Sequence, residues 1–579
     1  MPEVSPKTPA VSAQNFFTKR SRWWLEPEFL ILVLFVVGAY FTRMTDLSVR
    51  GEESRRGLIA REMLTTGDWI VPCCQGVPLF SRPPLQNWLI ALVALVRGDV
   101  DQVALRLPSD CAILLTVILI YGYSRTFLTR MGALTAGAAY ASMGQVLELG
   151  RSGETDALFT LFVSGSLLLW HLCFVRGESP YKTWCLSYLF VALGILTKGP
   201  QAPIYFAGVV GAYLLVTRNW RFAFSRAHAA GIGLFCLVYG AWQIPYTLSL
   251  GLKGAGQMYV NDVGHRFLDL SLSLFSTHLA EYPLETLVCL LPWSGLLIVW
   301  CRPRFRKTLG YAGNHALFLM LCVAVTFPTV WLPPGSRPRY FMCLYPCVAL
   351  LAAIVANRVS RTRNSEPWRI VWPVFVKGSA AVMAGAGLGV LALSLGDVKI
   401  WFKPTPGLAE LYFASALVVA GVAWWSATTP TPVRRRLAVL AIAGFSAFTY
   451  DTVLINGFQG TTVDTEGAIA QLKQKLPPHA NLVSFDKTHH LFVYHYHNHI
   501  PICPYPEALE DVDDSIRYFC VDANELAGHP LPFSWETVAE VNCDRHFEQH
   551  PRWRIIVGHR TDIPATASTH SKAAAAKRN

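Results

Sequence analysis

Two adjacent carboxylates, Glu52 and Glu53, open the polar segment 51–85, GEESRRGLIAREMLTTGDWIVPCCQGVPLFSRPPL. A carboxylate can orient an attacking hydroxyl or amine and accept its proton, so both residues are candidate catalytic groups. The alternative is a solvated helix start, because acidic side chains favour the first turn of a helix through its dipole. The two carboxylates taken alone favour the helix start, whereas the arginines around them favour a catalytic role.

Four arginines share this segment: Arg55, Arg56, Arg61 and Arg82. Guanidinium groups bind phosphate oxygens through paired N–H groups, so the segment suits an anionic substrate. Arg82 directly precedes a Pro-Pro pair that restricts its backbone, which favours a fixed role. Arg55 can instead pair with Glu52 three residues earlier, and Arg61 has the features of a plain surface residue.

The composition indicates a membrane protein with many spans. Of 579 residues, 52% are hydrophobic and 15% are charged, and the mean hydropathy is +0.34. The net charge of +12 does not indicate nucleic-acid binding, because much of the basic excess falls in short clusters between apolar runs.

Apolar runs of about 20 residues, enough to cross a bilayer as a helix, recur along the chain. We place about thirteen spans near 27–43, 107–126, 131–149, 156–175, 184–199, 201–217, 229–248, 284–301, 315–332, 339–357, 370–395, 408–427 and 435–456. Trp88–Val96 is too short to cross and is predicted to lie at the interface. Phe29–Phe41 is expected to act as a retained signal anchor.

Lys and Arg cluster at 19–22, 125–130, 218–226, 302–307, 358–363 and 434–436. With thirteen spans all of these clusters fall on one face, which the positive-inside rule makes cytoplasmic. Segment 51–85 and the C-terminal tail then face outward. An acid-and-arginine segment at the outer bilayer surface suits chemistry on an anionic, lipid-linked substrate.

The tail is predicted to form a small extracytoplasmic α/β domain. We expect a helix at Gly467–Leu476 and strands at Asn481–Ser484, Leu491–Tyr496, Ser515–Val521 and Trp553–Val557. The expected organisation is a cytoplasmic segment 1–26, a membrane domain 27–456 with an outer catalytic loop 44–106, the α/β domain 457–560 and a disordered tail 561–579.

Further charged residues stand at outer ends of the predicted spans. Asp156 opens one span, where a substrate role and helix capping are about equally favoured. Lys198 ends another, where snorkelling to the interface is the favoured alternative to a phosphate contact. Arg266 and the RPRY string at 337–340 add positive charge on the same side.

Within the tail, five histidines lie close together in the sequence, at His489, His490, His495, His497 and His499. On a strand the last three would share one face and could hold zinc, but a plain polar face is favoured, because no Cys or carboxylate stands at a familiar ligand offset. We therefore predict no metal site. In an oxidising compartment the cysteines of the predicted soluble segments could form disulfides, with a pairing that the sequence does not determine. These cysteines are Cys73, Cys74, Cys503, Cys520 and Cys543.

The strings EESRRGLIAREMLTTGDWIVP and LFSRPPLQNWL resemble the first outer loop of bacterial aminoarabinose transferases and related protein O-mannosyltransferase-like enzymes. The family pattern there reads Asp-Glu-x-Arg-Tyr-Ala, Arg-Glu-Met, Gly-Asp-Trp-Ile-Val-Pro and Lys-Pro-Pro. Further matches follow in the same order: LRLPS at 105–109, Asp156, LTKGP at 196–200, HRF at 265–267, LPW at 291–293 and RPRY at 337–340. The resemblance covers about 29–356, with a looser match over the tail.

The resemblance implies an α-helical polytopic glycosyltransferase of GT-C type in the bacterial inner membrane. Such an enzyme moves a sugar from a polyprenyl-phosphate carrier to a lipid A-like glycolipid or a protein on the extracytoplasmic face. Phosphate is a competent leaving group, so no cofactor is obligatory, and the need for a divalent metal is left open. Membrane lipid is an expected partner and nucleic acid is not.

Carried over by position, Glu52 takes the place of the family's catalytic aspartate and Glu53 that of its acidic neighbour. The resemblance assigns the donor phosphate to Arg55, Arg82, Lys198 and Arg266. It assigns other substrate contacts to Arg56, Asp156, Arg337, Arg339 and Tyr340.

Four positions depart from the family pattern. Glu52 stands for Asp, Arg56 for Tyr and Arg82 for Lys, while Ser81 replaces an acidic residue. These changes keep the arrangement of acid and cations but leave the sugar, the acceptor and any metal contact open. A transporter or flippase of a lipid-linked anion is the alternative; it predicts charges spread through the spans and paired repeats, neither of which the sequence shows. A non-catalytic scaffold is a further alternative.

Overall fold

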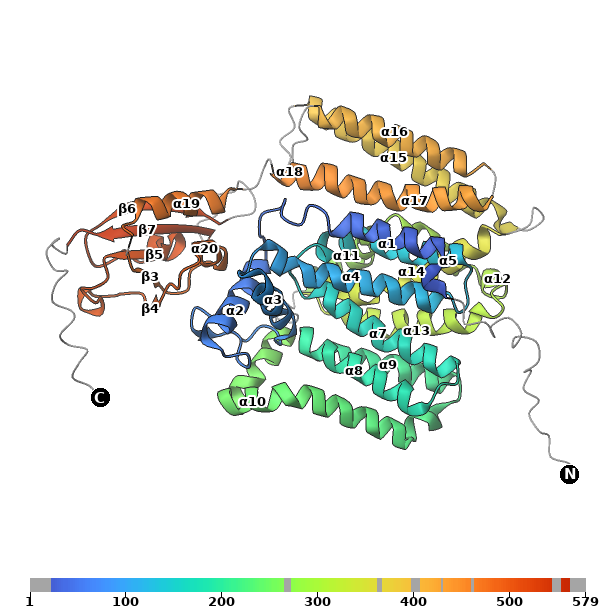
Figure 1. Ribbon diagram of the computed structural model, residues 1–579, viewed down its shortest axis with the longest axis horizontal. Coiled ribbons are helices and arrows are strands. Elements are labelled where there is room, and N and C mark those ends of the chain that lie inside the picture. Colours follow the sequence, from blue (N-terminus) through green and yellow to red (C-terminus); the bar gives the residue numbers. More distant parts are fainter. Residues whose placement is uncertain are drawn as a thin grey trace.

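A bundle of long helices makes up most of the molecule, and a small sheet domain lies at one end of it (Figure 1). The computed structural model describes residues 22–562 except 265–271, 362–366, 397–406, 429–430, 460–462, 479 and 544–552. In apolar surroundings a helix satisfies its own backbone hydrogen bonds, and this is why the apolar runs of this chain fold as helices.

The bundle helices are α1 (Pro27–Tyr40), α4 (Gln102–Ser124), α5 (Arg130–Ala141), α6 (Gly144–Gly150), α7 (Asp156–Val175), α8 (Pro180–Lys198), α9 (Gln201–Val216), α10 (Arg226–Gly264), α11 (Leu272–Cys289), α12 (Pro303–Arg306), α13 (Ala312–Trp331), α14 (Tyr345–Val359), α15 (Val371–Leu395), α16 (Leu408–Ser426), α17 (Pro432–Thr449) and α18 (Asn456–Gln459). Short helical turns of other pitch are η1 (Trp23–Leu25), η2 (Trp220–Phe224), η3 (Trp293–Cys301), η4 (Pro338–Leu344), η5 (Pro367–Ile370) and η6 (Tyr450–Ile455).

The chain is a multi-span membrane protein. Among the described residues, eight helical segments are long and apolar enough to cross a bilayer, and three shorter apolar helices add to them. Each of the thirteen expected runs is helical, although the run 131–149 breaks into α5 and α6, and the run 284–301 into α11 and η3. The count of thirteen crossings stays a prediction.

An outer segment covers the end of the bundle that faces the sheet domain (Figure 1). It contains α2 (Glu53–Thr66), β1 (Cys73–Cys74), β2 (Val77–Pro78) and α3 (Leu85–Arg97). Gly67, with φ 76°, ends α2 in the left-handed conformation that a glycine adopts readily. The short strands pair antiparallel around Gln75 and Gly76, which both have positive φ, as a two-residue hairpin turn requires.

The sheet domain is a small α/β unit. Its helices are α19 (Thr465–Lys475), α20 (His490–Tyr496) and α21 (Ala523–Gly528), with the short turn η7 (Leu509–Asp511). Its strands are β3 (Leu482–Phe485), β4 (Ile502–Cys503), β5 (Tyr518–Asp522), β6 (Trp535–Asn542) and β7 (Arg554–Arg560). They form one sheet in the order β4-β3-β5-β7-β6, parallel at β4-β3-β5 and antiparallel at β5-β7-β6.

The strand predicted at Leu491–Tyr496 is wrong, because this stretch forms most of α20. Phe492 and Tyr496 stack one helical turn apart, with ring centroids 6.0 Å from each other. Both side chains are buried, as are Val493 and Tyr494. This burial, which follows helical spacing, outweighs the alternation of histidines that resembles a strand.

The outer segment and the sheet domain share one apolar core. Leu58 of α2 and Ile90 of α3 are buried in the same cluster as Phe492 and Ile555. The hydroxyl of Tyr494 donates a hydrogen bond to the carbonyl oxygen of Val100 over 2.8 Å. The domain is therefore packed against the outer segment and supports it from the side opposite the bundle.

Candidate functional site

A polar cavity of about 600 Å³ opens where α2, α7, α8 and η4 meet. It is lined by Glu52, Arg55, Arg56, Phe80, Ser81, Arg82, Glu154, Thr155, Asp156, Lys198, Asn261, Gly335, Arg337, Arg339 and Tyr340. Six of these side chains are cationic and three are acidic. We call this space the cationic cavity.

Each acidic side chain in the cationic cavity has a close cationic partner. Glu52 Oε2 lies 2.8 Å from Arg55 Nη1, a pair on one face of the first turn of α2. Across the cavity, Glu154 Oε2 lies 2.7 Å from Arg339 Nη1. The Glu154–Arg339 pair holds together side chains from distant parts of the chain.

Asp156 and Lys198 form the third pair, and it is almost fully buried. Lys198 Nζ donates to Asp156 Oδ1 over 2.6 Å. The same ammonium lies 5.2 Å from the ring centroid of Tyr340. Lys198 is the last residue of α8, and Asp156 is the first of α7, so the pair joins two helix ends at the cavity. The buried ammonium is thus surrounded by a carboxylate and an aromatic face, which compensate its loss of water contacts.

Glu53 has a different environment from Glu52. It is fully buried, does not line the cationic cavity, and forms a two-pronged ion pair with Arg106 over 2.9 and 3.0 Å. It also accepts the backbone N–H groups of Gly153 and Arg50 over 2.7 and 3.1 Å. Burial alone would raise the pKa of Glu53, but the charge and hydrogen bonds of Arg106 and the Gly153 N–H bring it below the usual value.

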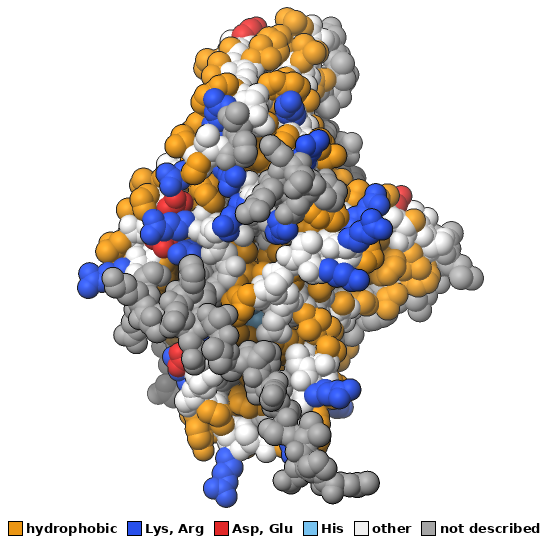
Figure 2. All heavy atoms as spheres, turned by 90° about the vertical axis from the view of Figure 1, so that its right-hand side faces the viewer, with side chains coloured by type: hydrophobic (Ala, Val, Ile, Leu, Met, Phe, Trp, Pro, Cys, Tyr) orange, Lys and Arg blue, Asp and Glu red, His pale blue; other side chains and the backbone are white. Residues whose placement is uncertain are grey.

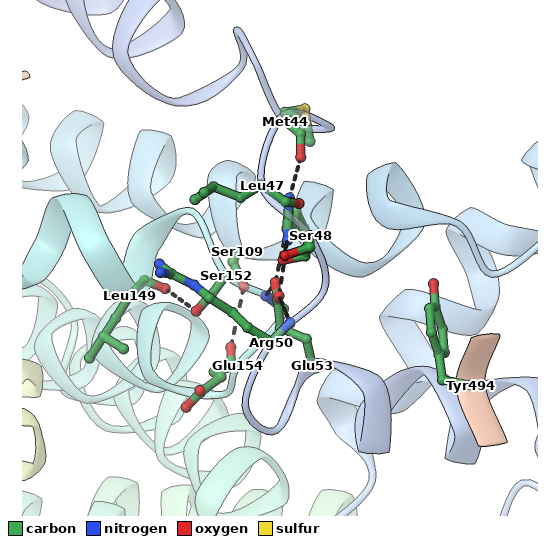
Figure 3. Close-up of polar contacts among 12 residues, drawn as sticks. Met44, Leu47, Ser48, Arg50, Glu53, Ser109, Leu149, Ser152, Glu154 and Tyr494 are labelled. Carbon is green, nitrogen blue, oxygen red and sulfur yellow. Dashed lines mark hydrogen bonds and ion pairs between the residues drawn. The ribbon is translucent and has the colours of Figure 1, made fainter. Parts of the chain in front are cut away.

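Arg106 extends this anchor to the connection between α1 and α2. Its guanidinium donates to the carbonyl oxygens of Met44, Leu47 and Ser48 (Figure 3). Arg106 therefore joins the first outer connection, α2 and α4 at one point. This arrangement favours an anchoring role for Glu53 and leaves Glu52 as the carboxylate exposed to the cavity.

Arg56 is buried at the cavity with little compensation. Its side chain is 5% exposed, its nearest carboxylate oxygen is Glu52 Oε2 at 3.9 Å, and its Nε has no hydrogen-bond partner among the described residues. Burial lowers the pKa of Arg56 to about 10, Glu52 opposes this effect, and the neighbouring charges of Arg82 and Arg55 add to it. The guanidinium remains charged at neutral pH and keeps hydrogen-bonding capacity.

Glu154 was missed from the sequence. It lies in the connection before α7, where its carbonyl oxygen accepts the hydroxyl of Ser109 (Figure 3). Burial raises the pKa of Glu154, Arg339 opposes this effect, and the negative charges of Asp156 and Glu52 add to it. The signal in the sequence was a second acid two residues before Asp156, in the string RSGETD.

A second cavity of about 620 Å³ lies between the outer segment and the sheet domain. Glu52 and Arg55 line this space as well as the cationic cavity. His489, His490 and Lys487 line it from the domain side. Glu52 thus borders both cavities.

Besides Glu53, three predicted features lie outside the cationic cavity or the described residues. Arg61 contacts the carbonyl oxygen of Tyr494 and stacks over its ring, so it belongs to the joint with the sheet domain. Arg266 lies outside the described residues. His490 accepts or donates a 2.6 Å hydrogen bond with Ser54 of α2.

Within the part of the chain that the structure describes, no group of three or more His, Cys, Asp or Glu side chains is arranged to hold a metal ion. All fourteen cysteines are free, including the five in the outer segment and the sheet domain.

Comparison with known proteins shows sequence similarity to glycosyltransferases. A family model described as dolichyl-phosphate-mannose-protein mannosyltransferase matches residues 81–243. An undecaprenyl phosphate-alpha-4-amino-4-deoxy-L-arabinose arabinosyl transferase from Pseudomonas aeruginosa is 27% identical over 413 residues, 68% of this chain and 71% of that protein. The transferase of the same name from Edwardsiella ictaluri is 26% identical over 392 residues, 66% and 68% of the two chains.

The fold is that of ArnT from Cupriavidus metallidurans. The structure of that protein bound to undecaprenyl phosphate superposes with a TM-score of 0.68 at 18% identity, over 92% of this chain and 98% of the other. The apo structure of the same protein superposes with a TM-score of 0.70, over 91% of this chain and 97% of the other.

The chain has the GT-C fold, and in sequence it is similar to membrane-embedded glycosyltransferases. In sequence and in fold it is similar to the bacterial aminoarabinose transferases, which confirms the resemblance seen in the outer segment.

Proposed function

We propose that this protein transfers a sugar from a polyprenyl-phosphate carrier to a glycolipid or protein acceptor, with inversion at the anomeric carbon, on the extracytoplasmic face of the bacterial inner membrane. The observation that carries the proposal is that the Glu52 carboxylate and six cationic side chains line one cavity at the end of the bundle. The names of the relatives agree with a polyprenyl-phosphate donor.

The distribution of charge supports the orientation. Figure 2 shows the end of the bundle opposite the sheet domain, where Lys and Arg are spread over the face and few acidic side chains are visible. The α12 helix at this end contributes Arg304 and Arg306. The positive-inside rule makes this end cytoplasmic, which leaves the cationic cavity and the sheet domain outside.

The proposed reaction is a direct displacement. An acceptor hydroxyl or amine attacks the anomeric carbon and gives its proton to Glu52. The bond from that carbon to the phosphate oxygen breaks, and the electron pair leaves with the polyprenyl phosphate. The products are the glycosylated acceptor and the carrier phosphate, so the step needs no oxidant or reductant.

The cations of the cavity stabilise the leaving phosphate. Arg82 and Lys198 are assigned to its oxygens, where they meet the negative charge as it grows. Asp156 holds the Lys198 ammonium in position, and Glu154 does the same for Arg339. Arg55 orients the Glu52 carboxylate, and Arg337 and Tyr340 complete the wall towards the substrate.

The domain boundaries are part of the proposal. Residues 27–456 form the transferase domain with its outer loop 44–106, and residues 457–560 form the extracytoplasmic domain. The shared core of the outer segment and the sheet domain supports a role of that domain in holding α2 beside the cavity.

The test is transfer by the full-length chain in lipid nanodiscs, with radiolabelled undecaprenyl phosphate-linked sugars and extracts of cell-envelope lipids and proteins as acceptors. Glu52→Gln should lower the transfer rate by about 100-fold or more, because a positioned general base contributes roughly that factor. Binding of undecaprenyl phosphate should change little. The matched control is Glu510→Gln, an exposed carboxylate of the sheet domain. Full transfer by Glu52→Gln would remove the carboxylate from the mechanism.

A further inference from the structure

Glu154 presents one of its two carboxylate oxygens to the cationic cavity. Its Oε2 lies 2.7 Å from Arg339 Nη1. Its Oε1 accepts no hydrogen bond from the residues that the structure describes, and it is not among the buried polar atoms that lack a partner. This oxygen is therefore open to a ligand in the cavity, although only 7% of the residue as a whole is exposed. A carboxylate oxygen in such a place is a strong hydrogen-bond acceptor.

The backbone around Glu154 is held on two sides. The N–H group of Gly153 donates to Glu53 Oε1 over 2.7 Å. The hydroxyl of Ser109 donates to the carbonyl oxygen of Glu154 over 3.2 Å (Figure 3). Because Glu53 directly follows Glu52 in the chain, one buried carboxylate helps to position two acids of the cavity. A side chain supported in this way is preorganised for binding.

Glu154 is near both partners of the displacement that we propose. Burial raises the pKa of Glu154, and Arg339 opposes this effect. The negative charges of Asp156 and Glu52 raise the pKa further, which requires both carboxylates to be near Glu154. Glu52 is the proposed base, and Asp156 holds the Lys198 ammonium that is assigned to the leaving phosphate. In a direct displacement the acceptor and the phosphate are on opposite sides of the anomeric carbon, so the sugar lies between them, near Glu154.

We propose that Glu154 binds the sugar of the donor by accepting a hydrogen bond from it, in addition to holding Arg339. This inference rests on the proposed function and adds a substrate-binding residue that the resemblance does not assign. The shared chemistry is an O–H or N–H group on the sugar, which a carboxylate accepts in a charge-assisted hydrogen bond. Its source is either a ring hydroxyl or the ammonium group of an amino sugar.

A binding experiment without acceptor isolates the contact with the sugar. The full-length chain in nanodiscs of neutral lipid is titrated with undecaprenyl methyl phosphate, a phosphodiester that has no sugar. It is also titrated with undecaprenyl phosphate linked to glucose, mannose, arabinose or 4-amino-4-deoxy-arabinose. The last two ligands differ only by a hydroxyl or an ammonium group at one carbon. The sugar preference is the affinity for a linked sugar divided by the affinity for undecaprenyl methyl phosphate.

The wild-type chain should bind at least one linked sugar about 10-fold or more tightly than undecaprenyl methyl phosphate. Glu154→Gln should remove most of this preference, because a hydrogen bond to a charged group is lost, and should change the affinity for undecaprenyl methyl phosphate by less than about threefold. If the lost preference is specific to the amino sugar, the contact is to its ammonium group; if it includes arabinose or a hexose, the contact is to a hydroxyl.

Arg339→Gln is the matched variant, because it breaks the same ion pair and keeps the Glu154 carboxylate. It should change the affinities for all five ligands by a similar factor, so that the sugar preference is retained. Glu510→Gln, which removes an exposed carboxylate of the sheet domain, should leave every affinity unchanged.

A sugar preference that survives Glu154→Gln would overturn the inference. An equal loss of affinity for all ligands in this variant would also overturn it, as would the absence of any preference in the wild-type chain. If Arg339→Gln lost the preference to the same extent, Glu154 would act only through that arginine. Failure of every ligand to bind would instead count against the proposed function, so the two failures can be told apart. If Glu154→Gln does not fold, the double variant with Arg339→Gln leaves neither charge of the pair uncompensated and decides the outcome.

Discussion

Glu53 Oε1 lies 2.9 Å from Arg106 Nε, and both side chains are almost completely buried. This ion pair fixes the start of α2 to α4, while Glu52, one residue earlier, lines two cavities. Two chemically identical neighbours thus have different environments. Glu53 holds the helix in place, and Glu52 faces the two cavities.

The first prediction concerns the stability of this anchor. Removing one partner of a buried ion pair leaves the other charge uncompensated and typically costs about 3–5 kcal/mol. In detergent, Glu53→Gln and Arg106→Gln should each clearly lower the melting temperature. The double variant should lose less stability than the two single variants add up to, because it leaves no uncompensated buried charge.

A matched comparison is Glu52→Gln, which removes a half-exposed carboxylate and should leave the melting temperature nearly unchanged. If Glu53→Gln were as stable as the wild type and impaired only in transfer, the anchoring role would be ruled out and Glu53 would return as a catalytic candidate.

The second prediction is a pH dependence with a definite sign. Arg106 and the Gly153 N–H group hold the pKa of Glu53, after the opposing effect of burial, below its usual value of 4.5. A group with a depressed pKa contributes stability in full above its unfolded value, and the contribution is lost as the pH falls through its folded value. Melting temperatures measured between pH 7 and pH 3 should therefore fall more steeply below about 4.5 in the wild type than in Glu53→Gln. Parallel curves would contradict the assignment.

The third prediction separates phosphate binding from structure at Lys198. Lys198→Gln should weaken undecaprenyl phosphate binding about 10-fold or more, the range for a charge-assisted hydrogen bond, and should also destabilise the fold by leaving Asp156 buried without its partner. Adding Asp156→Asn should recover stability but not affinity. The control is Lys182→Gln, whose ammonium is exposed and pairs with Glu178 at the surface. Recovery of affinity in the double variant would show that Lys198 acts only through the fold.

The class and the outline of the cavity could be predicted because they rest on strong signals. Apolar runs have to become helices in a membrane, and the ordered string matches place Glu52, Asp156, Lys198 and Arg337 in one site. Those residues are far apart in sequence, so spacing alone carries no information about their contact. Resemblance to a known pattern supplied it.

The different environments of Glu52 and Glu53 could not be predicted from the sequence. Consecutive residues of a helix point in directions about 100° apart, and the partner that decides the role of Glu53 is 53 residues away. The second cavity is also a product of tertiary packing, since its walls come from the outer segment and the sheet domain. Of the histidines on its wall, His490 and His495 lie in helix α20 and His489 caps that helix, and only His495 belongs to the stretch predicted as a strand.

The last prediction tests whether the sheet domain holds α2 in place. Gly57 lies directly against Tyr494, and a Cβ at this position would come within 2.7 Å of the Tyr494 ring. Gly57→Val should therefore push α20 away from α2, break the hydrogen bond between Ser54 and His490, and misplace Glu52. Transfer should fall several-fold, and amide hydrogen exchange in α2 and α20 should speed up while exchange in α13 is unchanged. Combining it with Tyr494→Ala makes room for the valine and should slow exchange again. If Gly57→Val kept full activity, the position of Glu52 would be set by the Glu53–Arg106 anchor alone.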